Sequence, residues 1–281
     1  MFNKVTILGV GLLGASFSLA LKKNSLCKTI TGCGRNRENL QRAKERNIID
    51  SFETDPVAAC RDADLVILST PVGSFLGLAQ TIAPALKRGA VLTDVGSVKG
   101  TLVRDLERIM PKGVHYIGVH PIAGSDRSGI DSANVELFRD AKCIITPTES
   151  SDPSALEKIQ ALWKAVGTQI VMLNPEEHDR IYAAVSHLPH LLAYALVNTV
   201  ADMDGSYLAF SGKGFMDATR IASSSEEVWN DICMLNRENL IDALAVFQKT
   251  LERLDQYLKA GNSDSLKNEF RKARAMRENI G

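Results

Sequence analysis

A glycine-rich turn near the N-terminus constrains this chain more than any other feature. The apolar run Val5–Leu8 leads directly into the six residues Gly9–Gly14, whose sequence is G-V-G-L-L-G. An apolar, helix-forming segment, residues 15–21, follows at once. A strand, a tight turn and a helix in this order are the setting in which the pattern G-x-G-x-x-G binds a dinucleotide.

Each glycine of this turn has its own physical role. Gly9 permits the tight turn, Gly11 lets the backbone approach a pyrophosphate, and Gly14 lets the helix pack closely on the strand. The start of the helix offers unpaired backbone N–H groups and the positive end of the helix dipole to the phosphates. The sequence therefore predicts a dinucleotide in contact with these glycines and with Leu12 and Leu13.

The composition is that of an ordinary globular protein and argues against several classes. Hydrophobic residues make up 45% and charged residues 23% of the 281 residues, and 33 Lys and Arg balance 33 Asp and Glu. No excess of charge therefore favours nucleic acid or a membrane surface as a partner. No apolar run approaches the ~20 residues that span a bilayer, and no signal peptide is expected. The five cysteines lack C-x-x-C spacing, which favours reduced thiols in the cytoplasm and no metal site.

The end of the second predicted strand, residues 28–33, indicates which dinucleotide is bound. Folds that bind NAD usually carry an acidic residue here, about twenty residues beyond the glycine turn, for the ribose 2′-hydroxyl. This chain has Gly34 instead, followed closely by Arg35 and Arg37. A guanidinium pairs with a 2′-phosphate, whereas a carboxylate repels it. We therefore predict NADP as the preferred cofactor. NAD stays possible, because the two arginines could also be solvated or stack on the adenine.

Strands alternate with helices through the first 173 residues. Strands are expected at 63–72, 90–97, 118–121, 141–147 and 169–173, and helices at 38–47, 75–86 and 153–166. This alternation predicts an α/β domain of the Rossmann type, with a doubly wound, mostly parallel sheet. Ligands of such sheets lie beyond the carboxyl ends of the strands. The residues that we expect to converge there are Ser69, Thr70, Pro71, Ser97 and His120.

The pattern changes at Asn174. The segment Asn174–Glu177 combines a helix-capping residue, a proline at the first helical position and acids in the first turn. Helical patterns then dominate over Glu176–Met203, Glu226–Leu258 and Ser263–Glu278, with a glycine-rich interruption at 205–225. We therefore predict a dinucleotide-binding domain over residues 1–173 and an all-helical domain over residues 174–281.

A proline in the first helix of this second domain is surrounded by polar residues. Pro189 cannot continue the helical hydrogen bonds, and Ser186, His187 and His190 lie around it. The alternatives are a kink that serves packing only, and an H-x-x-H metal pair. No carboxylate or cysteine at a companion spacing supports the metal.

Two further residues are candidates for chemistry. His120 follows a strand, and its pKa near working pH suits a general base, although it could equally cap the strand. Arg220 lies in the glycine-rich interruption, where a guanidinium could anchor a carboxylate substrate. His115 and His178 have no such setting, and we expect both to be structural.

Together these segments resemble the prephenate/arogenate dehydrogenase family of tyrosine biosynthesis. The matching motifs lie between about Val5 and Asn236, and they are Gly9–Gly14, Asp94–Lys99, His120–Gly124, Ser186–His190 and Gly214–Ile221. The glycine turn is generic, whereas the other four in this order and spacing are specific. The resemblance implies an oxidative decarboxylation of prephenate or arogenate. Hydride leaves C4 of the substrate for NAD(P), the 4-hydroxyl loses its proton, and CO2 leaves as the ring becomes aromatic.

The resemblance also implies the roles of single residues. His120 matches the catalytic histidine, Ser97 the serine that helps to position the hydroxyl and this histidine, and Arg220 the residue that binds the substrate carboxylate. Residues from the helical domain would line the substrate pocket, namely Ser186, His187 and His190. The helical domain would form a homodimer. An apolar stripe at helical spacing agrees with this, although the stripe could instead pack within its own domain. Its residues are Ile241, Leu244, Ala245, Phe247, Leu251, Leu254 and Leu258.

Two other functions compete with this one. Two-domain NADP-dependent dehydrogenases of the 3-hydroxyacid or imine-reducing kind share the glycine turn and a helical second half. The 3-hydroxyacid enzymes rely on a lysine in the first long helix of that half, and residues 176–203 contain none. A regulatory protein that binds NADP without catalysis would not need Ser97, His120 and Arg220 together.

Overall fold

The chain forms two compact units, Met1–Asn236 and Arg237–Gly281. The computed structural model describes residues 2–124 and 129–280. The division between the units lies further along the chain than Asn174, because the helices that follow Asn174 contact the first unit through α5·α7 and α10·η1. Here α5 is Gly100–Ile109, α7 is Pro175–Tyr182, α10 is Glu226–Leu235 and η1 is the 3-10 turn Val72–Ser74.

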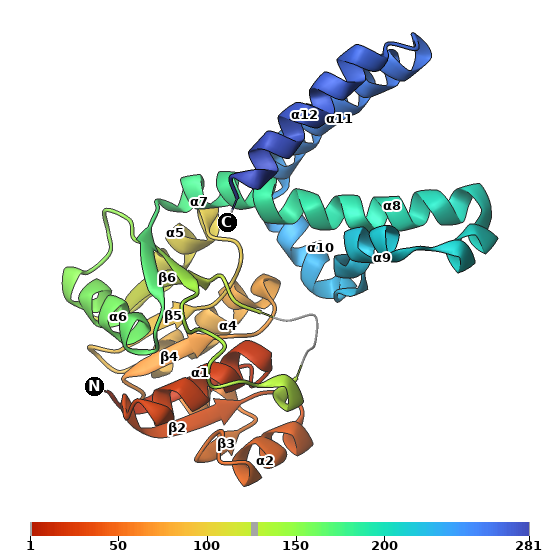
Figure 1. Ribbon diagram of the computed structural model, residues 1–281. Helices are drawn as coiled ribbons and strands as arrows, with labels where there is room; N and C mark the ends of the chain where they lie inside the picture. The colour runs from red at the N-terminus through yellow and green to blue at the C-terminus, as the bar shows by residue number, and fades with distance from the viewer. Residues whose placement is uncertain (1, 125–128, 281) are drawn as a thin grey trace. The chain divides into compact units, whose positions relative to one another are not determined.

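One eight-stranded sheet is the centre of the first unit (Figure 1). Its order is β3-β2-β1-β4-β5-β6-β7-β8. The neighbouring strands from β3 to β6 pair in parallel, β7 is antiparallel to β6, and β8 is parallel to β7. The predicted doubly wound, mostly parallel sheet is therefore confirmed. The strands are Phe2–Leu8 (β1), Cys27–Cys33 (β2), Ser51–Glu53 (β3), Leu65–Leu68 (β4), Val91–Asp94 (β5), His115–Pro121 (β6), Lys142–Thr146 (β7) and Gln169–Met172 (β8).

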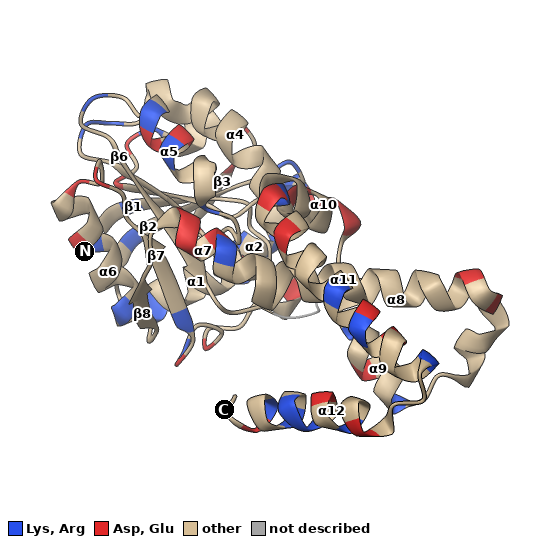
Figure 2. Ribbon diagram, turned by 90° about the horizontal axis from the view of Figure 1, so that it is seen from above, with Lys and Arg blue, Asp and Glu red and all other residues tan. Residues whose placement is uncertain are grey.

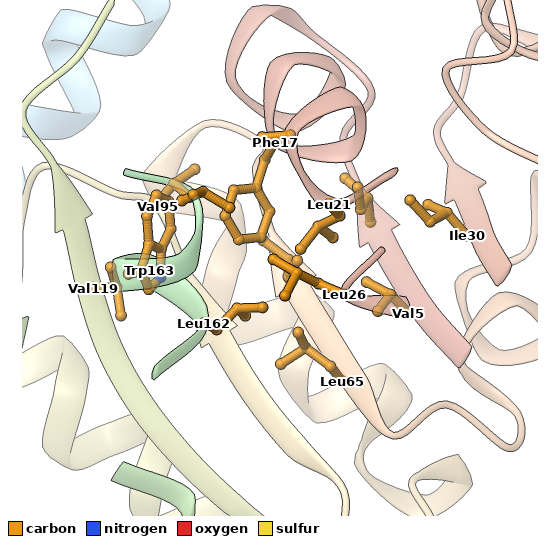
Figure 3. Packing of buried hydrophobic residues seen from close by; sticks show 14 of the residues in the cluster. Val5, Phe17, Leu21, Leu26, Ile30, Leu65, Val95, Val119, Leu162 and Trp163 are labelled. Atoms are coloured by element: carbon orange, nitrogen blue, oxygen red, sulfur yellow. The ribbon is translucent and has the colours of Figure 1, made fainter. Parts of the chain in front are cut away.

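Helices bury apolar residues on both faces of this sheet. Leu12–Lys23 (α1), Arg37–Glu45 (α2) and Pro153–Ala165 (α6) contribute to one apolar cluster, whereas Pro56–Cys60 (α3), Phe75–Ile82 (α4) and α5 contribute to the other. Figure 3 shows part of the first cluster, in which Phe17 of α1 stacks on Trp163 of α6 with ring centroids 4.4 Å apart. All four residues of β4 are buried, as expected for a parallel strand covered on both faces.

Local signals determine where several helices begin. The side chains of Asn36, Asp55, Asp152 and Asn174 accept backbone N–H groups in the first turns of α2, α3, α6 and α7. Three of these helices also have a proline in the first turn, where the missing N–H costs nothing. The helix start predicted at Asn174 is confirmed.

The strand order reverses next to β1. From there β2 and β3 extend the sheet to one side, and β4 and the later strands extend it to the other. The carboxyl ends of β1 and β4 are therefore the switch point at which such sheets bind ligands.

The predicted helix 176–203 is confirmed as helical, but its middle is not α-helical. The chain forms α7, then a π-helical turn at Ala183–His187, and then Leu188–Asp204 (α8). Pro189 has no N–H to donate to the preceding turn, and a π-helical turn is one way to accommodate this break. Further on, the predicted helix 226–258 is interrupted after α10 at Asn236, and the predicted interruption at 205–225 contains a short helix, Lys213–Thr219 (α9).

The second unit is a pair of helices, Arg237–Lys259 (α11) and Ser263–Glu278 (α12), which lie side by side (Figure 1). An ion pair with an N–O distance of 3.2 Å joins Arg253 of α11 to Glu269 of α12. Basic and acidic residues both occur along α12, whereas α8 carries charge only near its end (Figure 2). Within residues 2–124 and 129–280, no helix combines the length and the apolar character that crossing a membrane requires.

Candidate active site

A pocket of about 640 Å³ lies at the switch point of the sheet. The glycine turn after β1, the loop after β2 and the loop after β4 all contribute to its walls. Among the predicted cofactor residues it is lined by Gly9, Gly11, Arg35, Ser69, Thr70 and Pro71. Four other predicted residues do not line it, and these are Leu12, Leu13, Gly14 and Arg37.

The glycine turn fits the phosphates of a dinucleotide. Gly9 has a φ of +98°, and a Cβ there would lie 2.5 Å from the carbonyl oxygen of Ser69. A Cβ on Gly14 would lie 2.3 Å from the carbonyl oxygen of Gly9, so this residue packs the helix onto the turn behind the pocket. A Cβ on Gly11 would meet no atom of residues 2–124 and 129–280 within 4 Å, which leaves bare backbone facing the pocket. Gly11 is the N-cap of α1 and has no side chain that could cap it, so it leaves the first N–H groups of the helix open to an anion.

The two arginines after β2 differ in their surroundings. Arg35 lines the pocket. The guanidinium carbon of Arg37 lies 5.4 Å from the centroid of the Phe52 ring, a cation–π contact. Asn36, between them, also lines the pocket and caps α2. Arg35 is therefore the better placed of the two to meet a 2′-phosphate.

A chain of hydrogen bonds extends from His120 into the protein. Nδ1 of His120 lies 2.9 Å from Nε2 of His178, and Nδ1 of His178 lies 2.8 Å from Oδ1 of Asp179. The same Asp179 oxygen accepts the backbone N–H of Lys99 at 2.7 Å. The ring of Tyr182 packs against both histidines, with centroid distances of 4.8 Å to His120 and 4.5 Å to His178.

This arrangement determines the tautomers of both histidines. An ionised carboxylate only accepts hydrogen bonds, so Nδ1 of His178 carries the proton that it donates to Asp179. Nε2 of His178 then accepts the Nδ1–H of His120, and Nε2 of His120 is left with a lone pair. His120 is thereby prepared to accept a proton at Nε2.

Burial controls the protonation of this group. Burial lowers the pKa of His120 well below its usual value, and the neighbouring His178, Lys99 and His187 lower it further. Burial also lowers the pKa of His178, to about 2. Burial raises the pKa of Asp179 to about 6, opposed by the hydrogen bond from the Lys99 amide. At pH 7 both histidines are therefore neutral and Asp179 is mostly ionised.

His187 in the π-helical turn belongs to the same buried group. Its Nδ1 lies 3.0 Å from Nδ2 of Asn236, and this amide also donates to the carbonyl oxygen of Asp179 at 2.8 Å. Burial lowers the pKa of His187 to about 4, while Asp179 and then the Ser97 carbonyl act to raise it. Ser97 is thus close enough to His187 to affect its pKa.

His190 and Arg220 adjoin this group. Nδ1 of His190 lies 2.9 Å from the carbonyl oxygen of Ser186, and its ring stacks on Trp229 with centroids 3.4 Å apart. Burial lowers the pKa of His190, the Ser186 carbonyl opposes the shift, and the charge of Arg220 lowers it further. The guanidinium of Arg220 is therefore within electrostatic reach of His190.

The predicted site residues thus form two groups. One group lines the 640 Å³ pocket, and the predicted catalytic and substrate residues form the other. The residues of this second group, none of which lines the pocket, are Ser97, His120, Ser186, His187, His190 and Arg220. The 3-10 turn η1 contributes Ser74 to the wall of that pocket. A hydrogen bond of 3.2 Å from the Gly73 amide in this turn to Oδ2 of Asp231 joins it to α10.

Sequence reasoning missed several members of the histidine group. His178, expected to be structural, is fully buried and hydrogen-bonds His120. Asp179, Asn236 and Trp229 were not singled out either. No motif or spacing points to them, because they reach the site only through the packing of α7 and α10.

Comparisons with known proteins identify the family of this chain. The profile of the prephenate dehydrogenase nucleotide-binding domain matches residues 17–172, and that of the prephenate dehydrogenase dimerization domain matches residues 174–272. The chain is 31% identical over 284 residues to the prephenate dehydrogenase of Bacillus subtilis, a match that covers 100% of this chain and 76% of that one. It is 32% identical to the cyclohexadienyl dehydrogenase of Zymomonas mobilis, with 99% and 96% covered.

A solved structure is similar over the whole chain. It is the prephenate dehydrogenase from A. aeolicus in complex with hydroxyphenyl propionate and NAD+. The TM-score is 0.94 at 35% sequence identity, and the match covers 100% of this chain and 99% of that one.

Proposed function

The chain belongs to the prephenate dehydrogenase family, as its motifs predict, and we propose how its side chains carry out the reaction of that family. The protein is an NAD(P)-dependent dehydrogenase that decarboxylates prephenate oxidatively in tyrosine biosynthesis. When bound, the nicotinamide dinucleotide accepts a hydride from C4 of the substrate. The protein must hold the substrate, remove the proton of its 4-hydroxyl and stabilise the substrate's carboxylates.

His120 is the general base, and the hydrogen-bonded series His120–His178–Asp179 is the observation that carries this assignment. Asp179 orients His178, and His178 in turn accepts the Nδ1–H of His120. The lone pair at Nε2 of His120 then points away from His178, and Nε2 accepts the proton of the substrate's 4-hydroxyl. The positive charge that develops on His120 is stabilised through His178 by the Asp179 carboxylate.

Arg220 binds a carboxylate of the substrate, and Ser97 helps to orient the hydroxyl towards His120. Ser186 and His190 line the substrate pocket, and His187, whose side chain is wholly buried, supports this wall through Asn236 and does not touch the substrate. The Ser97 carbonyl affects the pKa of His187 and Arg220 affects that of His190, which supports a common site for these residues. A guanidinium suits a carboxylate because its N–H donors can pair with both oxygens.

His120→Asn tests the assignment of the base. We expect kcat with prephenate, followed by the absorbance of the reduced cofactor, to fall about 100-fold or more, with a modest change in KM. His115→Asn is the matched control, since His115 lies at the other end of the same strand, and its kcat should stay normal. Near-normal turnover by His120→Asn would remove this residue from the role of base. The same assay with arogenate measures which of the two substrates is preferred.

We also propose NADP as the preferred dinucleotide, with Arg35 as the main partner of its 2′-phosphate and Arg37 as a lesser one. The position of Arg35 in the pocket wall and the absence of a carboxylate at Gly34 support this preference. Arg35→Ala should lower kcat/KM for NADP by about 10- to 100-fold, the value of one charge-assisted hydrogen bond, and leave NAD nearly unaffected. Arg37→Ala should lower it less, because its guanidinium packs over Phe52. A wild-type preference for NAD would contradict the proposal.

Residues 1–173 are proposed as the dinucleotide-binding domain and residues 174–281 as the substrate-binding and dimerisation domain. The two profile matches, which meet between residues 172 and 174, support this division. Exposed apolar side chains on the helices support a homodimer, among them Val185, Met203, Phe210, Ile241, Leu251 and Leu258. The cysteines are all free thiols, which supports a cytoplasmic location.

A further inference from the structure

Two oppositely charged side chains are completely buried beside the histidine group. Asp94, the last residue of β5, and Lys99, the residue before α5, both have 0% side-chain exposure. Nζ of Lys99 lies 2.7 Å from Oδ2 of Asp94. A buried ion pair is weak evidence of stabilisation, because the loss of hydration of two charges offsets much of their attraction. What the two side chains hold in place is therefore more informative than the pair itself.

Lys99 holds the loop that carries Ser97. Its ammonium group donates to the carbonyl oxygens of Gly96, at 2.6 Å, and Val98, at 3.3 Å. These are the residues immediately before and after Ser97. Oδ2 of Asp94 accepts the N–H of Gly96 at 2.8 Å. The backbone on both sides of Ser97 is thus tied to the buried ion pair.

The other oxygen of Asp94 holds the strand that carries His120. Oδ1 accepts the hydroxyl of Tyr116 at 2.7 Å and the backbone N–H of Val119 at 3.0 Å. Val119 directly precedes His120 in β6. The backbone N–H of Lys99 also donates to Asp179, at the far end of the hydrogen-bonded series that begins at His120. One carboxylate therefore connects the loop of Ser97 to the strand of His120.

We propose that Asp94 and Lys99 are positioning residues that fix Ser97 relative to His120. Because both side chains are wholly buried, neither reaches the substrate. This inference rests on the proposed roles of Ser97 and His120. A displacement of about 1 Å between reacting groups can lower the rate by about 100-fold, so a rigid connection of this kind has a catalytic effect without contact to the reacting atoms.

The double variant Asp94→Asn/Lys99→Met separates positioning from stability. Either single change leaves a buried, unpaired charge and is expected to destabilise the fold, whereas the double change removes both charges together. We expect the double variant to melt close to the wild type and its kcat with prephenate to fall about 100-fold. The KM of the dinucleotide should change by less than about twofold, since other residues line that pocket.

Lys87→Met is the matched control for this experiment. Lys87 also forms an ion pair, 2.5 Å from Oδ1 of Asp64, and lies outside the site. Its loss should leave kcat unchanged. A double variant that retains wild-type kcat would overturn the positioning role. One that fails to fold, or melts far below the wild type, would assign the pair a structural role and overturn it as well.

Ser97→Ala distinguishes a failure of this inference from a failure of the proposed function. If Ser97→Ala alone leaves kcat unchanged, the proposed role of Ser97 is wrong, and the inference falls with it. If Ser97→Ala lowers kcat and the double variant does not, only the positioning role is wrong. When Lys99 and Asp94 act through Ser97, adding Ser97→Ala to the double variant lowers kcat by no more than about twofold. If the fall in kcat of the triple variant equals the product of the falls caused by Ser97→Ala and by the double variant, the pair acts independently of Ser97, and the inference is overturned.

Discussion

Alanine at Gly14 is expected to loosen the junction between the first helix and the glycine turn. The added Cβ would lie 2.3 Å from the carbonyl oxygen of Gly9 and 2.9 Å from a methyl carbon of Ile7, whereas ordinary contacts begin at 3.4 Å. The obstacle is backbone, so it cannot rotate away as the end of a flexible side chain could. The N-terminus of α1 must therefore move away from the turn by about 1 Å, as judged from the size of the overlap.

The size of the effect follows from two opposing contributions. Overpacking in a tight interior costs about 1–3 kcal/mol, and an obstacle made of backbone places this case at about 3 kcal/mol. Alanine is the better helix former by about 1 kcal/mol, which offsets part of the cost. The remaining loss of about 2 kcal/mol corresponds to a fall in Tm of about 4–8 °C for a chain of this size. The displaced helix start should also weaken dinucleotide binding about tenfold, the value of one hydrogen bond to a charged group.

Gly11→Ala provides the comparison that makes this test specific. A Cβ on Gly11 meets no atom within 4 Å in the part of the chain that the structure describes, and the φ of Gly11, -101°, is accessible to alanine. We expect an unchanged Tm in a thermal melt of the protein without ligand. The new methyl group stands in the pocket, so the Kd of the dinucleotide, measured by titration of protein fluorescence, should rise about tenfold or more.

The two variants thus differ in a way that a general loss of folding cannot produce. An unchanged Tm for Gly14→Ala would refute the packing role of this glycine. An unchanged Kd for Gly11→Ala would show that the pyrophosphate does not lie against this part of the backbone.

The substrate site, the buried histidines and the helical segment each allow one further measurement. Arg220→Ala should raise KM for prephenate about tenfold or more, with a smaller effect on kcat, and unchanged steady-state constants would show that another residue holds the carboxylate. Burial lowers the pKa of His178 to about 2 and that of His187 to about 4, whereas the pKa of an unfolded histidine is about 6.5. Below about pH 6.5 the unfolded chain therefore binds more protons than the folded chain. The free energy of unfolding should therefore fall by about 2 kcal/mol for each of these two residues from about pH 7 to about pH 5. The raised pKa of Asp179, about 6, offsets roughly 1 kcal/mol of this loss of stability. Equal midpoints of urea unfolding at the two pH values would contradict this reasoning. Sedimentation at micromolar concentration should give a dimer, and a monomer there would argue against the proposed assembly.

Much of the fold could be predicted because its signals are local. The glycine turn, the buried apolar run of β4 and the capping residue Asn174 each act over a few neighbouring residues. The elements β3 and α3 were not predicted, since three to five residues carry too weak a pattern. The helix α5 was also missed, although Leu102, Val103 and Leu106 follow a helical spacing that could have indicated it. The predicted helix 226–258 missed the break at Asn236, whose buried side chain binds the Asp179 carbonyl and His187.

By itself, the sequence determined the family, the sheet and the residues at its carboxyl edge, including His120, because these depend on motifs and on the order of the strands. Only the tertiary structure decided that His178 hydrogen-bonds His120 across 58 positions of the chain, and that Lys99 reaches Asp179 across 80. It also decided that Arg35 faces the pocket while Arg37 packs on Phe52. The physical reason is that a buried polar group must find partners wherever the packed elements bring them, and that pairing has no period or spacing along the chain.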